Sequence, residues 1–244
     1  MSTDECRVDV MNFGLARDRR RFFIERGLRR RTRGGRGGAL DSLMGLPRTE
    51  IDVNARELFG TIPFCVVGGV ATRAYMPERS TKDIDFLVGA DDFEAAERRL
   101  LGAGYAAVAQ DDDLFFYDSM LGLFGRAWRR EDERIDLISS RQDWVHEALA
   151  TEHYDQTGLR VIALPYLVLM KIDASRGQDQ ADVERMLGRL GDAEVERVAR
   201  IVDRYSGDPQ AAEDVRQYAA LGRMEYARGR VPEDDNRTLE DDNC

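Results

Sequence analysis

A pair of glycines between two short apolar runs constrains this chain more than any other feature. The run Phe64–Val67 is too short for a helix and rich in β-branched residues, which predicts a buried strand. Gly68 and Gly69 follow it directly, and the residues after them can begin a helix. A polar loop over residues 77–82 then leads into a second predicted strand, residues 83–88.

The second predicted strand carries two carboxylates on one face. Side chains alternate between the faces of a strand, so Asp83 and Asp85 should project together. The apolar residues Ile84, Phe86 and Val88 should enter a core on the other face. Two neighbouring carboxylates can bind a divalent cation through oxygen, and a glycine turn before a helix N-terminus lets backbone N–H groups approach a phosphate. Together these features predict a site for a metal-bound nucleoside triphosphate.

The stretch resembles the nucleotidyltransferase fold of the DNA polymerase β superfamily, and within it the AbiEii-like and minimal prokaryotic nucleotidyltransferases. The residues that carry the resemblance are Gly68, Gly69, Ala71, Arg79, Thr81, Asp83, Ile84, Asp85 and Phe86. The resemblance extends, less sharply, to residues 134–138 and 165–187. It implies an α/β (α+β) fold in which a small mixed sheet flanked by helices precedes a helical C-terminal region.

The resemblance also implies an enzyme that moves a nucleoside monophosphate from a nucleoside triphosphate to a hydroxyl acceptor. Relatives modify tRNA ends, proteins or small molecules, so the acceptor stays open, as do a cognate partner and a place in a toxin–antitoxin or phage-defence system. Asp83 and Asp85 are expected to hold two Mg²⁺ ions, one of them shared with Asp136. Asp136 lies on a strand predicted at residues 134–138, which should pair with the Asp83 strand, and is also the candidate to accept the hydroxyl proton. Lys171 is expected to approach the triphosphate or the catalytic carboxylates.

Lysine is scarce in this chain. Only Lys82 and Lys171 are lysines among the 36 basic residues, and both fall in stretches singled out on other grounds. An ammonium is a compact charge that differs from a planar guanidinium, so either a need for lysine or chance placement accounts for this. The predicted contacts to the nucleotide are Gly68, Gly69, Arg79, Thr81 and Lys82.

Periodicity and turn residues predict the remaining elements. Helices are expected at residues 50–59, 91–101, 144–149, 166–175, 183–190, 193–205 and 211–228, and further strands at 105–109, 114–117, 134–138 and 158–164. Gly177 is predicted to end the helix that carries Lys171, and Asp179 with Asp182 to form a capping box for the next one. Arg176 and Asp182 are further site candidates. Four arginines near Asp136 form either a basic track or a solvated strand edge, namely Arg126, Arg129, Arg130 and Arg134.

Composition divides the 244 residues into four parts. Residues 1–47 form an Arg/Gly-rich arm expected to be disordered, 48–164 the nucleotidyltransferase domain, 165–229 the helical region and 230–244 a disordered acidic tail. The arm is either an RNA- or phosphate-binding segment or a non-native extension. Since the formal net charge is −10 despite this basic arm, the body is strongly acidic, which argues against broad non-specific nucleic-acid binding. No apolar run approaches the ~20 residues of a membrane span, and the three cysteines are far apart, which favours a cytoplasmic protein.

Three other interpretations compete with the enzyme. A non-catalytic nucleotide-binding module would keep the same fold and site without chemistry. A dinucleotide-binding enzyme is disfavoured because no G-x-G-x-x-G follows the first strand and the D-x-D strand comes too soon. A purely structural interaction protein leaves the clustered glycines, carboxylates and lysines unexplained.

Overall fold

The computed structural model describes residues 54–76, 83–108 and 119–229, and near the N-terminus residues 17–18, 20–22 and 24–25. The predicted nucleotide contacts Arg79, Thr81 and Lys82 lie outside the described residues, as do the predicted strand 114–117 and the acidic tail from residue 230.

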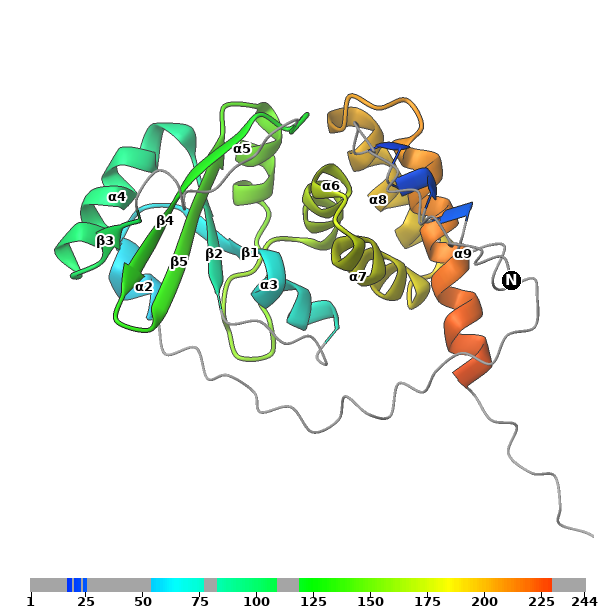
Figure 1. Ribbon diagram of the computed structural model, residues 1–244, viewed down its shortest axis with the longest axis horizontal. Coiled ribbons are helices and arrows are strands. Elements are labelled where there is room, and N and C mark those ends of the chain that lie inside the picture. Colours follow the sequence, from blue (N-terminus) through cyan, green and yellow to red (C-terminus); the bar gives the residue numbers. More distant parts are fainter. Residues whose placement is uncertain are drawn as a thin grey trace, which may run out of the picture.

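The described residues form a five-stranded mixed sheet in the order β1-β2-β5-β4-β3 (Figure 1). The strands are β1 (Phe64–Val67), β2 (Ile84–Val88), β3 (Ala106–Ala107), β4 (Leu123–Arg130) and β5 (Glu133–Ser140). β2 and β5 are parallel neighbours, and the other pairs are antiparallel. The predicted mixed α/β fold is confirmed, and so is the pairing of the Asp136 strand with the strand that follows Asp83.

Helices cover both faces of the sheet. Around it lie α2 (Ala55–Phe59), α3 (Gly68–Tyr75), the 3₁₀ turn Ala90–Asp92, α4 (Phe93–Gly102) and α5 (Asp143–Ala150). The C-terminal helices are α6 (Leu164–Ala174), α7 (Gly177–Gly188), α8 (Asp192–Tyr205) and α9 (Ala211–Gly229). α4 lies on one side of the sheet, while α6 to α9 form a group on the other side, which α3 faces (Figure 1). In the described part of the chain, no helix is long and apolar enough to cross a membrane.

An aromatic cluster fixes which way β2 faces. Phe59, Phe64 and Phe86 are buried, and their ring centroids lie 4.9 to 5.8 Å apart. Burying each ring contributes roughly 1.5–3 kcal/mol. A slip of β2 by one residue would remove Phe86 from this cluster and turn Asp85 into it, so the cluster holds Asp85 on the opposite face.

Two predicted boundaries near Lys171 are wrong. The helix α6 ends at Ala174, before Ser175, which adopts the left-handed conformation with φ 48°. Gly177 does not follow this helix as its terminator but begins α7. Pro165 lies in the first turn of α6, and the helix is buried on most sides.

The strand predicted at residues 158–164 does not form. Only isolated pairings occur there, between Val66 and Val161 and between Tyr154 and Arg160. The carboxylate of Asp155 accepts hydrogen bonds from the backbone N–H groups of Thr157 and Leu159, at 2.8 and 2.9 Å. This turn, with Gly158 at φ 82°, replaces the first half of the expected strand.

Two residues of the predicted N-terminal arm are buried against the C-terminal helices. Ile24 and Arg20 are 2% and 3% exposed. The Arg20 guanidinium forms ion pairs with Asp208 and Asp214, the latter with Nε–Oδ2 at 3.1 Å. It also donates to the carbonyl of Ile172 at 3.0 Å. At these residues the expectation of an arm with nothing to bury is wrong, and most of residues 1–47 lie outside the described part of the chain.

Candidate active site

The predicted carboxylates meet on one line across the sheet. Backbone pairing places Val67 beside Asp85, Asp85 beside Asp136, and Asp136 beside Ala127. Paired residues on neighbouring strands point to the same face and lie roughly 5 Å apart. The side chains of Asp85 and Asp136 are therefore neighbours on the face opposite the aromatic cluster.

Asp83 lies at the edge of this pair. It is exposed and directly precedes β2, whereas the prediction placed it within the strand. Its charge raises the pKa of both Asp85 and Asp136, so all three carboxylates are within electrostatic range of one another. The structure thus brings together the three residues predicted as metal ligands.

Gly68 allows the closest contact in the site. It has φ 60°, and a Cβ at this position would lie 1.9 Å from Oδ2 of Asp85. No residue with a side chain fits there without moving the carboxylate. The next residue, Gly69, donates its backbone N–H to Asp85. Both glycines belong to the first turn of α3, two residues earlier than the helix was predicted to begin, and they bring this turn into contact with the carboxylate strand.

Ionisation of the two central carboxylates is unfavourable. Burial is the main cause that raises the pKa of Asp85 to about 7, and the charges of Asp136 and Asp83 add to it. Arg176 and the Gly69 N–H act in the opposite direction. Burial also raises the pKa of Asp136, opposed by Arg134. The site therefore holds more negative charge than its surroundings compensate.

Two arginines partly compensate this charge, and sequence reasoning did not assign either to the site with a defined role. Arg134 donates from Nε to Oδ1 of Asp136 at 2.9 Å. Arg176, the residue before α7, donates to Asp179 at 2.6 Å. The charge of Asp85 also raises the pKa of Arg176, after the larger effect of Asp179. The helical region thus places a guanidinium within electrostatic range of the sheet carboxylates.

Lys171 has partners of its own in the helical region. Its buried ammonium lies 3.1 Å from Oδ1 of Asp179 and 2.8 Å from Oδ2 of Asp182. The predicted capping box is wrong, because Arg176 takes the N-cap position of α7 with no side-chain cap, and both aspartates turn inward to the lysine. Buried carboxylates need such a counter-charge. The predicted approach of Lys171 to the triphosphate or the sheet carboxylates stays a prediction.

The donor set fits a divalent cation. Among the described residues, no three histidine, cysteine or acidic side chains are gathered closely enough to enclose an ion. However, Asp83, Asp85 and Asp136 supply the hard oxygen donors that Mg²⁺ prefers. Their charges oppose one another's ionisation, and a cation would relieve this repulsion.

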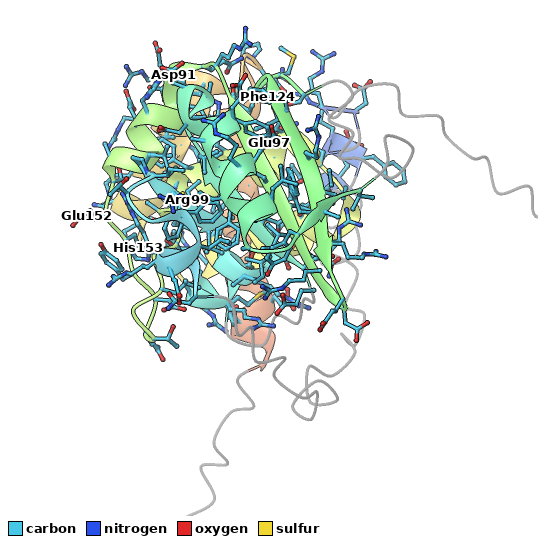
Figure 2. The ribbon with its side chains drawn as sticks, turned by 90° about the vertical axis from the view of Figure 1, so that its left-hand side faces the viewer. Asp91, Glu97, Arg99, Phe124, Glu152 and His153 are labelled. Atoms are coloured by element: carbon cyan, nitrogen blue, oxygen red, sulfur yellow. The ribbon has the colours of Figure 1, made fainter. Side chains whose placement is uncertain are left out.

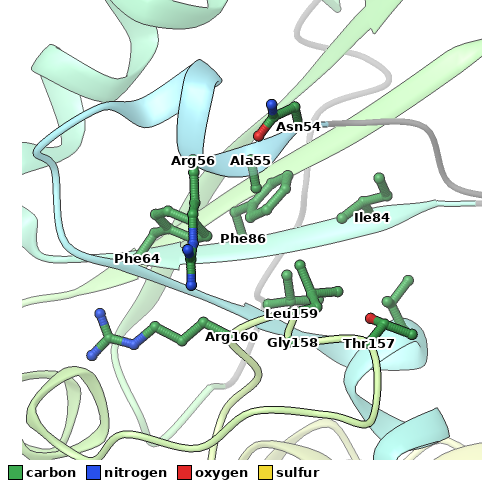
Figure 3. Close-up of a pocket in the computed structure, with 12 residues that line it drawn as sticks. Asn54, Ala55, Arg56, Phe64, Ile84, Phe86, Thr157, Gly158, Leu159 and Arg160 are labelled. Carbon is green, nitrogen blue, oxygen red and sulfur yellow. The ribbon is translucent and has the colours of Figure 1, made fainter.

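A cavity of about 300 Å³ lies on the other face of the sheet (Figure 3). Phe64, Ile84 and Phe86 line it, and Arg56 extends over it from α2. Because side chains alternate along a strand, Ile84 and Phe86 point away from the face that carries Asp85. The cavity is therefore separate from the carboxylate site.

Comparison with known proteins finds only weak structural similarity. No family model matches the chain, and no curated protein matches it. A crystal structure of ANT(2'')-Ia in complex with adenylyl-2''-tobramycin has a TM-score of 0.34 and 15% identity, and the match covers 68% of this chain and 89% of that chain. A solution structure of the same antibiotic-resistance factor has a TM-score of 0.35 and 16% identity, covering 68% and 84%. At these values, nothing about ligand or reaction is transferred to this chain.

Proposed function

We propose that this protein is a metal-dependent nucleotidyltransferase that moves a nucleoside monophosphate from a nucleoside triphosphate to a hydroxyl acceptor. The observation that best supports this proposal is the contact between the glycine turn and the carboxylate line. Gly68 leaves no room for a Cβ beside Asp85, and Asp85 lies beside Asp136 on the parallel strand. The turn proposed to bind phosphate and the pair proposed to bind a cation thus lie at one position on the sheet.

In this proposal Asp83, Asp85 and Asp136 hold two Mg²⁺ ions. Metal bound there would supply polarisation of the attacking hydroxyl and neutralisation of charge on the phosphates. The acceptor oxygen forms a bond to the α-phosphorus, the bond from that phosphorus to the β-phosphate oxygen breaks, and pyrophosphate leaves. The raised pKa of Asp136 suits it to accept the hydroxyl proton.

The triphosphate would lie over the first turn of α3. There the backbone N–H groups of that turn and the helix N-terminus favour an anion. The loop residues Arg79, Thr81 and Lys82 are proposed to add contacts from the segment that leads into β2. Arg176 would stabilise the developing negative charge from the helical side.

Lys171 would act through Arg176. The two oxygens of Asp179 are shared, since Oδ1 contacts Lys171 and Oδ2 contacts Arg176. The lysine fixes this carboxylate in the interior, and the carboxylate in turn holds the guanidinium. We therefore propose Lys171 as a positioning residue for Arg176, in addition to its expected approach to the triphosphate.

The test is incubation with Mg²⁺ and each α-³²P-labelled nucleoside triphosphate, with total tRNA, cell lysate or a panel of small hydroxyl compounds as acceptors. We expect label to appear in one acceptor class with release of pyrophosphate. Asp85→Ala should remove turnover, while Asp91→Ala, an exposed carboxylate in the 3₁₀ turn, should retain it. Full turnover by Asp85→Ala would refute the assignment.

A second candidate is a nucleotide-binding module without chemistry, for instance a component that acts on a cognate toxin or antitoxin partner. The bond from Arg134 to Asp136 favours it, because a guanidinium there competes with a cation for the same carboxylate. This candidate predicts nucleotide binding without pyrophosphate release in any acceptor mixture.

A further inference from the structure

The arginines near Asp136 divide between the two faces of the β4–β5 hairpin. Arg126 and Arg130 belong to the outer face. Arg126 donates to Glu97 of α4 at 2.8 Å, and Arg130 donates to Glu133 at the same distance. Figure 2 shows Glu97 on this side, close to Phe124 of β4. These two arginines therefore have carboxylate partners away from the site.

Arg129 and Arg134 belong to the face that carries the catalytic candidates. They are directly opposite each other in the antiparallel register, two pairs along from Ala127 and Asp136 and so on the same face. Like charges at directly opposed positions destabilise a sheet. Arg134 is compensated by Asp136, but Arg129 is exposed, and no carboxylate of the described residues pairs with it. An anion bound between the two guanidiniums would remove the repulsion.

The donors needed for such an anion are present. Arg134 is bonded to Asp136 through Nε, which leaves its two terminal nitrogens to bind a further acceptor. Arg129 brings a second planar guanidinium from the neighbouring strand. Two such groups match the oxygens of a phosphate.

The location separates this pair from the glycine turn. The sheet order is β1-β2-β5-β4, so Gly68 lies on the β1 side of Asp85, whereas Arg129 and Arg134 lie on β4 and β5. On the proposed function, the triphosphate occupies the glycine side. The attacking hydroxyl then approaches from the Asp136 side, where the arginine pair is located.

We propose that Arg129 and Arg134 bind a phosphate group of the acceptor. This inference rests on the proposed function and adds a substrate class to it: the acceptor carries a phosphate monoester or diester close to the hydroxyl that is modified. A nucleic-acid strand and a small phosphorylated metabolite share this chemistry. The formal net charge of −10 means that the rest of the protein adds little attraction for such a ligand, so the pair should dominate binding.

The experiment compares Arg129→Gln with Arg126→Gln. Each variant removes one positive charge from β4, on opposite faces of the same strand. The probes are a fluorescein-labelled single-stranded oligoribonucleotide and adenosine 5′-monophosphate, each titrated in Mg²⁺ with a non-hydrolysable nucleoside triphosphate analogue present. We expect Arg129→Gln to weaken binding of at least one probe about fivefold or more, and Arg126→Gln to change it less than twofold. Arg129→Lys should recover part of the loss.

Salt dependence provides a second measurement for the oligoribonucleotide. Each phosphate contact contributes about 0.7 to the slope of log affinity against log salt for a single strand, so Arg129→Gln should lower the slope by about that amount. If Arg129→Gln weakens binding of the oligoribonucleotide alone, the acceptor is a nucleic-acid strand. If it weakens binding of both probes, the pair accepts any phosphate monoester or diester.

Three results would overturn the inference. Equal binding by Arg129→Gln and Arg126→Gln would show that the pair binds no acceptor phosphate. Weaker binding of the triphosphate analogue alone by Arg129→Gln would assign the pair to the nucleotide instead. Wild-type turnover of an acceptor that lacks phosphate, as fast as that of any phosphorylated acceptor, would refute the acceptor class and leave the nucleotidyltransferase standing. The proposed function itself fails separately, through the comparison of wild type with Asp85→Ala.

Discussion

Replacing Asp85 with asparagine should stabilise the folded protein, and more so as the pH rises. The pKa of Asp85 is raised from 3.8 to about 7 in the folded chain, first by burial and then by the neighbouring carboxylates Asp136 and Asp83. The folded state thus keeps the proton up to about pH 7, whereas the unfolded chain loses it near pH 3.8. The stability that the proton provides is complete below pH 3.8 and is lost as the pH rises to about 7.

The size of the change in unfolding free energy follows from the pH interval between two measurements. One pKa unit corresponds to about 1.36 kcal/mol, so the two units from pH 5 to pH 7 correspond to about 2.7 kcal/mol, with little further change by pH 8. Asparagine has nearly the same shape, and its side-chain oxygen can accept the Gly69 N–H, but it carries no charge at any of these pH values. The difference in unfolding free energy between Asp85→Asn and wild type should therefore grow by about 2 to 3 kcal/mol from pH 5 to pH 8.

Urea unfolding followed by tryptophan fluorescence measures this difference, because Trp128 and Trp144 are both buried. Asp91→Asn, which removes an exposed carboxylate, serves as the control and should show a constant difference. If the Asp85→Asn difference is also constant with pH, the burial and charge repulsion inferred for this site are wrong. At pH 8, millimolar Mg²⁺ should stabilise the wild type but not Asp85→Asn, since only the wild type has the full set of ligands.

Gly68→Ala should destabilise the protein by about 2 kcal/mol or more in urea unfolding, for two reasons. Alanine is strained in the left-handed backbone conformation at φ 60°, and its Cβ would lie 1.9 Å from a carboxylate oxygen of Asp85. The control Gly102→Ala meets nothing within 4 Å and should be neutral or stabilising. Arg20→Ala leaves the buried Asp214 and the partly buried Asp208 without a counter-charge and should cost about 3–5 kcal/mol, against less than about 0.5 kcal/mol for the half-exposed Arg17→Ala. Lys171→Met should cost a similar 3–5 kcal/mol for the same reason, and an unaltered midpoint would contradict its buried ion pair.

Local pattern was sufficient for much of the sheet and the carboxylate line. β1 has the predicted bounds, the alternation around Asp136 predicted a strand there, and the expected pairing of that strand with the strand after Asp83 is observed. The first strand is a continuous apolar run, as suits a strand buried at every residue, and the second alternates with a period of two; both patterns are visible within five residues. The predicted strand at 158–164 failed because Asp155 binds the backbone two and four residues on, a turn that outweighs the β-branched residues after it.

Partners that come from distant segments could not be predicted in this way. The burial of Arg20 depends on Asp208 and Asp214, which are almost 200 residues away in sequence, and nothing in the surrounding arginines sets this one apart. Arg134 is a different case, because Asp136 lies only two residues away on the same strand and alternation already places both side chains on one face. Because all but two of the 36 basic residues are arginine, the composition offers no signal for the few that have a defined partner.

The rarity of lysine correctly indicates that position 171 is constrained, but it does not identify the residues that bind the ammonium. Lys171 was expected at the triphosphate because an uncommon residue type in a critical stretch indicates a chemical need. The structure supplies such a need within the helical region, where one ammonium lies between Asp179 and Asp182 and all three are buried. A guanidinium is larger and planar, and would have to displace one of these carboxylates or the helix that carries them. A rare residue therefore identifies a position under constraint, and the partners around that position identify its role. Since Asp179 also holds Arg176, the proposed positioning role predicts that Lys171→Arg weakens nucleotide binding by moving Arg176.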